Sequence, residues 1–142
     1  MRYYIIAGEA SGDLHGSNLI KELRKPDANA VIRCWGGDRM QQAGGELVKH
    51  YRDLAFMGFI EVVKNLGTIL RNLKFCKEDI KRFQPDTLIL IDYPGFNLRI
   101  AEWARKEGIK VLPEIMIPLT MDKKEFQIME KQTRSVAEAL IK

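Results

Sequence analysis

A run of apolar residues that ends directly on a carboxylate constrains this chain more than any other feature of its sequence. Residues 87–91 read TLILI, Asp92 follows at once, and the turn-forming pair Pro94 and Gly95 comes after Tyr93. A continuous apolar run is typical of a strand that is covered on both faces of a parallel sheet. Because burying an unpaired carboxylate is costly, the strand is expected to leave Asp92 outside the core.

Short apolar stretches alternate with amphipathic stretches along most of the chain. The pattern predicts strands at residues 2–7, 30–35, 46–48, 86–91 and 109–112. Apolar residues at helical spacing predict helices at residues 13–25, 39–43, 59–83 and 96–107, with a bend in the third left open at 65–67. This order is typical of an α/β domain with right-handed crossovers. We therefore predict a doubly wound parallel sheet.

The composition fits a globular domain with a core of its own. The chain has 142 residues, of which 46% are apolar, and its net charge is +4. Lys and Arg are scattered through the predicted helices instead of forming one compact patch, so no nucleic-acid partner is expected. The basic residues are interpreted as a solvated face, with attraction to anionic phosphates or to an anionic leaflet as the alternative.

Cysteine and histidine usage gives no sign of a metal site. Cys34 and Cys76 lie far apart, and His15 and His50 add no ligand spacing. We expect reduced thiols, no metal and no cofactor. No signal peptide is recognised, and no run approaches the ~18 apolar residues of a membrane span. The chain is expected to be cytoplasmic, with any membrane contact peripheral.

Three loops of unusual chemistry follow predicted strands. They are GEASGD at 8–13, GGDR at 36–39 and DYPGFN at 92–97. Ligands of parallel α/β sheets bind beyond the carboxyl ends of the strands, where such loops converge. Asp92 is therefore expected at the mouth of its strand, facing a crevice.

The GEASGD loop precedes a helix, whose N-terminus and backbone N–H groups could hold an anion. Its glycines at 8, 12 and 16 match neither the dinucleotide fingerprint nor the P-loop. Ser11 or Asp13 could instead be the N-cap of the helix. Glu9 is harder to explain structurally, because nothing about a turn requires it.

The other two loops offer a cation and an acid. Arg39 suits a phosphate, although a surface arginine in a short helix is the simpler interpretation. Asp92 could cap the helix that follows it, but Pro94-Gly95 separates the two, and Asn97 lies nearer the helix N-terminus. We therefore interpret Asp92 as a general base.

The segment 56–75 is rich in apolar residues, most of which core packing explains. Phe56, Met57 and Phe59 surround Gly58 in a connector, and this concentration of flexible and aromatic groups could line an apolar groove.

Four blocks of the sequence carry a resemblance to a known family. They are AGEASGDLHGSNLIKEL at 7–23, GGDRMQQAGGE at 36–46, DLAFMGFIEVVKNL at 53–66 and PDTLILIDYPGFNLRIAEWARKEGIKV at 85–111. In order and spacing they resemble the amino-terminal half of the lipid-A-disaccharide synthases, which are inverting glycosyltransferases of the GT-B architecture. The resemblance covers residues 1–111 and implies a Rossmann-like domain.

The resemblance also implies a reaction. Such enzymes transfer diacylglucosamine from UDP-diacylglucosamine to diacylglucosamine 1-phosphate through a β-1,6 linkage, and release UDP without a metal. Asp92 is then the base for the acceptor 6-hydroxyl. Met57 falls where the family has a hydrophobic patch suited to acyl chains or a membrane. The remaining residues expected to bind substrate are Glu9, Ser11, Gly12, Arg39 and Asn97. Many members carry a second Asp where this chain has Gly95, which removes a paired carboxylate but leaves Asp92.

Residues 112–142 resemble the family's extreme carboxy-terminus. A helix at 122–141 is expected to pack back on the domain of residues 1–111, either within one chain or exchanged in a homodimer. The UDP-binding domain is expected to be missing, so the chain alone is expected to be inactive. The inner leaflet of the cytoplasmic membrane is the expected peripheral partner. Two alternatives remain open: a flavodoxin-like module that binds an anion or nucleotide without transferase chemistry, and, more weakly, a UDP-sugar epimerase.

Overall fold

The structure, a computed structural model, describes residues 1–54, 66–91 and 93–115 of the chain. Its strands are β1 (Arg2–Ala7), β2 (Val31–Gly36), β3 (Glu46–His50), β4 (Thr87–Ile91) and β5 (Val111–Ile115). Its helices are α1 (Ala10–Arg24), α2 (Asp38–Gln42), the 3₁₀ turn η1 (Tyr51–Asp53), α4 (Leu66–Phe83) and α5 (Pro94–Lys106).

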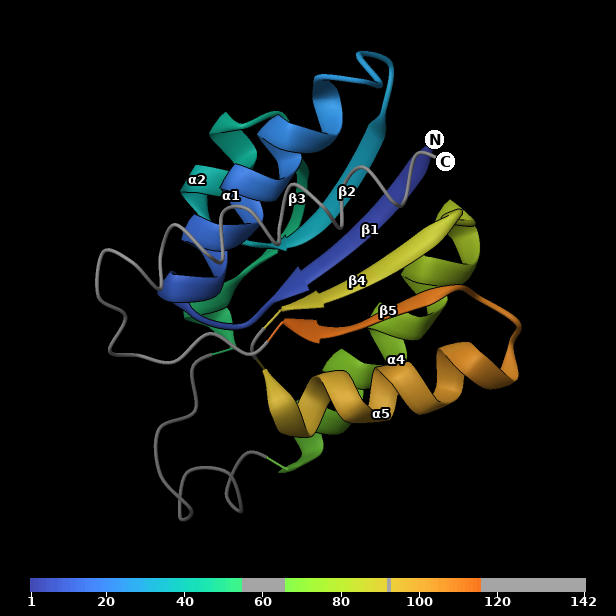
Figure 1. Cartoon of the computed structure of the whole chain (residues 1–142). Coiled ribbons are helices and arrows are strands. Elements are labelled where there is room, and N and C mark those ends of the chain that lie inside the picture. Colours follow the sequence, from blue (N-terminus) through green and yellow to red (C-terminus); the bar gives the residue numbers. More distant parts are fainter. Residues whose placement is uncertain (55–65, 92, 116–142) are drawn as a thin grey trace.

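The strands form one parallel sheet in the order β3-β2-β1-β4-β5. α1 and α2 cover one face and α4 and α5 cover the other (Figure 1). This arrangement confirms the predicted doubly wound, Rossmann-like α/β fold. The chain moves outward from β1 through β2 to β3, and then returns to the other side of β1 for β4 and β5. The direction of winding therefore reverses between β1 and β4.

Alternation along β1 divides the core into two layers. Tyr3, Ile5 and Ala7 pack with the α1 and α2 side, whereas Tyr4 and Ile6 pack with the α4 and α5 side. All five side chains are fully buried. In β4, the run TLILI is buried at each position, as the sequence indicated.

Several predicted boundaries differ from those observed, most by one or two residues. α1 begins at Ala10 instead of residue 13, because Glu9 takes the extended N-cap conformation. α5 begins at Pro94 instead of residue 96, since proline fits the first position of a helix. Pro94 and Gly95 therefore belong to α5 and do not separate Asp92 from it in the sequence, contrary to the prediction.

β5 begins two residues later than predicted and crosses the expected boundary between the domain and the tail at 111/112. The reason lies in the end of α5. Gly108 takes a left-handed φ of 75°, and the N–H of Ile109 donates to the carbonyl of Ala104 at 2.9 Å. This closing turn keeps residue 109 out of the strand. The helix predicted at 59–83 is described from residue 66 onward, and the expected tail helix at 122–141 lies outside the described residues.

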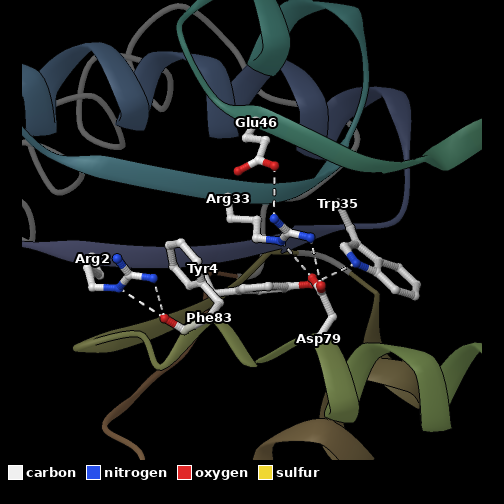
Figure 2. Close-up of polar contacts among 7 residues, drawn as sticks. All are labelled: Arg2, Tyr4, Arg33, Trp35, Glu46, Asp79 and Phe83. Carbon is white, nitrogen blue, oxygen red and sulfur yellow. Dashed lines mark hydrogen bonds and ion pairs between the residues drawn. The ribbon is translucent and has the colours of Figure 1, made fainter. Parts of the chain in front are cut away.

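A polar network anchors α4 to the sheet (Figure 2). The Arg33 guanidinium donates to both oxygens of Asp79, at 2.8 and 2.7 Å. The Tyr4 hydroxyl donates to Asp79 at 2.7 Å and accepts from the indole N–H of Trp35 at 2.9 Å. Glu46 accepts from Arg33 at the exposed end of the network, at 2.8 Å. Each buried polar group thus has a partner, which such networks need in order to be stabilising.

Both cysteines are free and buried, as predicted. Burial raises the pKa of Cys34 to about 12 and raises that of Cys76 well above its ordinary value. Neither thiol forms an appreciable thiolate at neutral pH, so both behave as packing groups.

The network predicts an asymmetric response to substitution. Asp79→Asn removes the carboxylate from a site with 4% exposure and leaves Arg33 without its bidentate partner, so we expect a loss of about 3 kcal/mol in the free energy of unfolding. Glu46→Gln changes the same cluster at a side chain that is 63% exposed, and its expected loss is below about 1 kcal/mol. Urea unfolding followed by circular dichroism measures both. Equal losses would contradict the assignment of Asp79 as the anchor.

Candidate functional site

The site is built where the loops after β1 and β4 meet. The two strands are hydrogen-bonded neighbours in which Ala7 pairs with Ile91, so both loops leave the sheet side by side. This is the point at which the strand order reverses, and ligands of open α/β sheets bind in the crevice at such a point. Asp92, the predicted base, follows Ile91 directly but lies outside the described residues, as does Met57.

Tyr93 joins the two loops, and the sequence had given it no role. Its ring stacks on Phe96 with centroids 5.1 Å apart, and its hydroxyl donates to the carbonyl of Leu54 at 3.3 Å. The ring lies directly over Gly8, where an added Cβ would collide with its Cγ. Gly8 is therefore needed for this close approach. The only signal in the sequence was an aromatic residue inside a turn.

Glu9 lies close to this aromatic residue. Burial, and secondly the charge of Glu9, raise the pKa of the Tyr93 hydroxyl. Glu9 is exposed, occupies the N-cap position of α1 and makes no capping hydrogen bond with its side chain. Its carboxylate thus has no capping duty in α1, and its assignment as a site residue stays a prediction.

Ser11 and Gly12 lie in the first turn of α1. Neither Ser11 nor Asp13 caps this helix, so the capping interpretation of the sequence was wrong. The hydroxyl oxygen of Ser11 is buried and has no hydrogen-bond partner among the described residues. Gly12 packs α1 against the sheet, since a Cβ there would lie 3.0 Å from that of Ala7.

Asp13 instead caps a different helix. It is 3% exposed, and its carboxylate accepts from the N–H groups of Gly37 at 2.8 Å, Met40 at 3.0 Å and Arg39 at 3.2 Å. These are N–H groups at the start of α2, a helix whose own N-cap is a glycine without a side chain. Asp13 therefore binds the loop after β2 to the first turn of α1. Its signal in the sequence was the absence of any capping side chain before α2.

Arg39 and Asn97 have different surroundings. Arg39 is exposed on α2, on the helix that Asp13 holds. Asn97 is 1% exposed, and its amide donates to the carbonyl of Ile91 at 3.4 Å, which ties α5 to the end of β4. Its Oδ1 atom has no partner among the described residues. Asn97 lies beneath the loop surface, so the structure gives it a supporting position.

Within the described ranges, no group of three or more His, Cys, Asp or Glu side chains could hold a metal ion. The same ranges contain no helix that is long and apolar enough to span a membrane.

The capping role of Asp13 is testable against a matched acid on α2. Asp13→Ala leaves three N–H groups without their acceptor, and we expect a loss of about 2 kcal/mol in the free energy of unfolding. Asp38→Ala removes an exposed carboxylate from the same helix, with an expected change within about 0.5 kcal/mol. Hydrogen exchange should accelerate at the amides of Gly37 and Met40 in the first variant only. Unchanged exchange there would refute the role.

Comparison with solved structures supports the fold. The crystal structure of UDP-GlcNAc 2-epimerase from Neisseria meningitidis bound to UDP-GlcNAc superimposes with a TM-score of 0.56 over 99% of this chain and 38% of that chain. The two sequences are 14% identical. At this identity the likeness shows a shared fold and carries no information on activity.

Sequence comparisons are more specific. Lipid-A-disaccharide synthase from Geobacter metallireducens is 45% identical over 111 residues, which cover 78% of this chain and 29% of the relative. The synthase from Coxiella burnetii (strain Dugway 5J108-111) is 41% identical over 108 residues, which cover 76% and 29%. The chain thus spans less than a third of the length of these relatives. The model of the lipid-A-disaccharide synthetase family matches residues 3–118, and the chain belongs to this family.

Proposed function

We propose that this chain forms the acceptor-side domain of a lipid-A-disaccharide synthase. The observation that carries the proposal is the close approach of the Tyr93 ring to Gly8, the residue before Glu9, at the reversal point of the sheet. The two loops that match the family's blocks leave neighbouring strands side by side, which supports one shared substrate site. In the full enzyme, a GT-B partner domain would supply the UDP-sugar donor, diacylglucosamine on UDP.

In the proposed reaction, the 6-hydroxyl oxygen of diacylglucosamine 1-phosphate attacks the anomeric carbon of the donor. The bond from that carbon to UDP breaks, the configuration inverts, and UDP leaves with the bonding electrons. Asp92 takes the hydroxyl proton as general base, which makes the oxygen more nucleophilic while the new bond forms. Glu9 would accept hydrogen bonds from acceptor hydroxyls, and Ser11 and Gly12 would contact the substrate beside it. Arg39 would pair with the acceptor phosphate.

The described neighbours of Asp92 support this role. Ile91 is 1% exposed and paired with Ala7. Tyr93 is held by Phe96, Leu54 and Gly8. A base is effective only when it is held within hydrogen-bond reach of its proton, and both flanking residues are firmly placed. Because the substrates carry acyl chains, the proposed place of action is the inner membrane, on its cytoplasmic side. Met57 is the proposed contact for these chains.

The binding part of the proposal is tested by titrating the ¹⁵N-labelled chain with diacylglucosamine 1-phosphate below its aggregation limit, and separately with UDP. We expect the acceptor to shift the amide signals of Gly8, Glu9 and Tyr93, and UDP to leave them in place. Glu9→Gln should weaken acceptor binding about tenfold, the loss of one charged hydrogen bond, whereas Glu107→Gln at the far end of α5 should not. Binding of UDP with an inert acceptor would instead support a nucleotide-binding module.

The catalytic part is tested in a full-length synthase of the family at the position that corresponds to Asp92. Replacement by asparagine keeps the size of the side chain and removes the base, so kcat should fall by at least about 10². KM for the acceptor should change little, because binding groups remain. Unchanged transfer would eliminate Asp92 as the base.

A further inference from the structure

Tyr93 occupies a helix position that its side chain does not serve. It is the N-cap residue of α5, where Ser, Thr, Asp and Asn are preferred because their side chains accept from the free N–H groups of the first turn. The side chain of Tyr93 makes no capping hydrogen bond. The reason for an aromatic residue at this position must therefore lie in what its ring and hydroxyl contact.

These contacts reach three segments that are far apart in the sequence. The ring lies over Gly8, which follows β1, and stacks on Phe96 in the first turn of α5. The hydroxyl donates to the carbonyl of Leu54, the residue after η1. Burial raises the pKa of this hydroxyl, so it stays protonated and keeps its donor role at neutral pH.

The contact with Gly8 is the closest of the three. Gly8 is buried, and its backbone does not take a left-handed φ, the conformation for which glycine is usually needed. A Cβ at this position would collide with Cγ of Tyr93 and would lie 2.6 and 2.7 Å from its Cδ2 and Cδ1 atoms. The three nearest atoms to such a Cβ are thus all ring atoms of Tyr93. Glycine at position 8 and tyrosine at position 93 are therefore one joint requirement.

Both acids of the proposed site adjoin this contact in the sequence. The last residues of β1 and β4 are paired with each other, and the contact joins the two loops just beyond that pair. Glu9 follows Gly8, and Asp92 precedes Tyr93. Each acid is therefore one residue away from a group that the contact holds in place.

We propose that Tyr93 is a positioning residue for glycosyl transfer: the contact of its ring with Gly8 sets the spacing between Glu9, on the acceptor, and the base Asp92. Tyr93 itself takes no proton and touches no reacting atom. This role rests on the proposed function. Because a misplacement of about 1 Å can lower a rate about 10²-fold, the contact should act on kcat more than on KM.

The test uses a full-length synthase of the family that carries glycine and tyrosine at these two positions. Gly8→Ala displaces the ring, so kcat should fall about 10²-fold. Tyr93→Ala removes the contact without inserting a new group, and kcat should fall about tenfold. In the double variant the added methyl group meets no ring, so kcat should equal that of Tyr93→Ala and exceed that of Gly8→Ala about tenfold. KM for the acceptor should change less than about threefold in all three variants, because the binding groups remain.

Two further variants are controls. Gly95→Ala adds the same methyl group in the first turn of α5, where nothing lies within 4 Å of the new Cβ, and kcat should stay within about twofold. Tyr93→Phe keeps the ring and removes only the hydroxyl, so kcat should stay within about threefold. The comparison of Gly8→Ala with Gly95→Ala involves no change at position 93, and it remains decisive if Tyr93→Ala does not fold.

The contact itself is checked in the present chain by NMR. The protons of Gly8 lie against the ring and should show ring-current shifts that are lost in Tyr93→Ala and kept in Tyr93→Phe. In the enzyme, circular dichroism gives the folded fraction of each variant, and kcat is expressed per folded molecule. A purely structural role of Tyr93 would then leave kcat unchanged.

Three results would overturn the positioning role: an unchanged kcat in both single variants, a double variant as slow as Gly8→Ala, or a higher KM at constant kcat. A failure of the proposed function is measured separately, as unchanged transfer after replacement of Asp92 by asparagine. If that replacement abolishes transfer while Gly8→Ala and Tyr93→Ala leave kcat unchanged, only the positioning role is refuted.

Discussion

Burial of the central strand β1 from Tyr3 to Ala7 is the constraint on which the rest of this structure depends. The strand is paired on both edges and covered on both faces, so its side chains divide the core and its polar atoms must find partners inside it. The hydroxyl of Tyr4 is the critical case. This hydroxyl donates to Asp79 of α4, and the buried Asp79 carboxylate is in turn paired with Arg33. Because a buried polar group without a partner is costly, these contacts hold α4 on the sheet.

The crevice follows from the same strand. β1 ends at Ala7. The glycine after it lets the ring of Tyr93 lie close against the backbone. Asp13 fixes the position of α2 by accepting hydrogen bonds from the N–H groups at its first turn. Three loops that are distant in the sequence are therefore held by two side chains, and Glu9 is left exposed between them.

Features that depend on local sequence were predicted well, and features that depend on contacts between loops were not. The continuous apolar run TLILI predicts a strand covered on both faces, and the alternation of apolar and amphipathic stretches predicts strands joined by helices. Both patterns are local, which is why the parallel sheet could be predicted from the sequence. Asp13 looked like a cap for its own helix because the sequence shows that α2, more than twenty residues later, lacks a capping side chain but does not show which distant side chain supplies one. Tyr93 and Asn97 posed the same difficulty: a ring over a glycine and an amide on a strand carbonyl are visible only after the chain has folded. The roles of Asp92 and Met57 remain predictions from the sequence and from the family resemblance.

The common direction of the helices has an electrical consequence. α1, α4 and α5 all begin at the carboxyl edge of the sheet, so the positive ends of their backbone dipoles, about half an elementary charge each, point to the same side. The first turns of α4 and α5 contain no acid, and the one acid in that of α1 is directed to α2. At the opposite end, each last turn carries two basic residues against the negative pole. The backbone itself therefore gives the carboxyl edge of the sheet a positive potential, which would favour an anionic ligand before any arginine takes part.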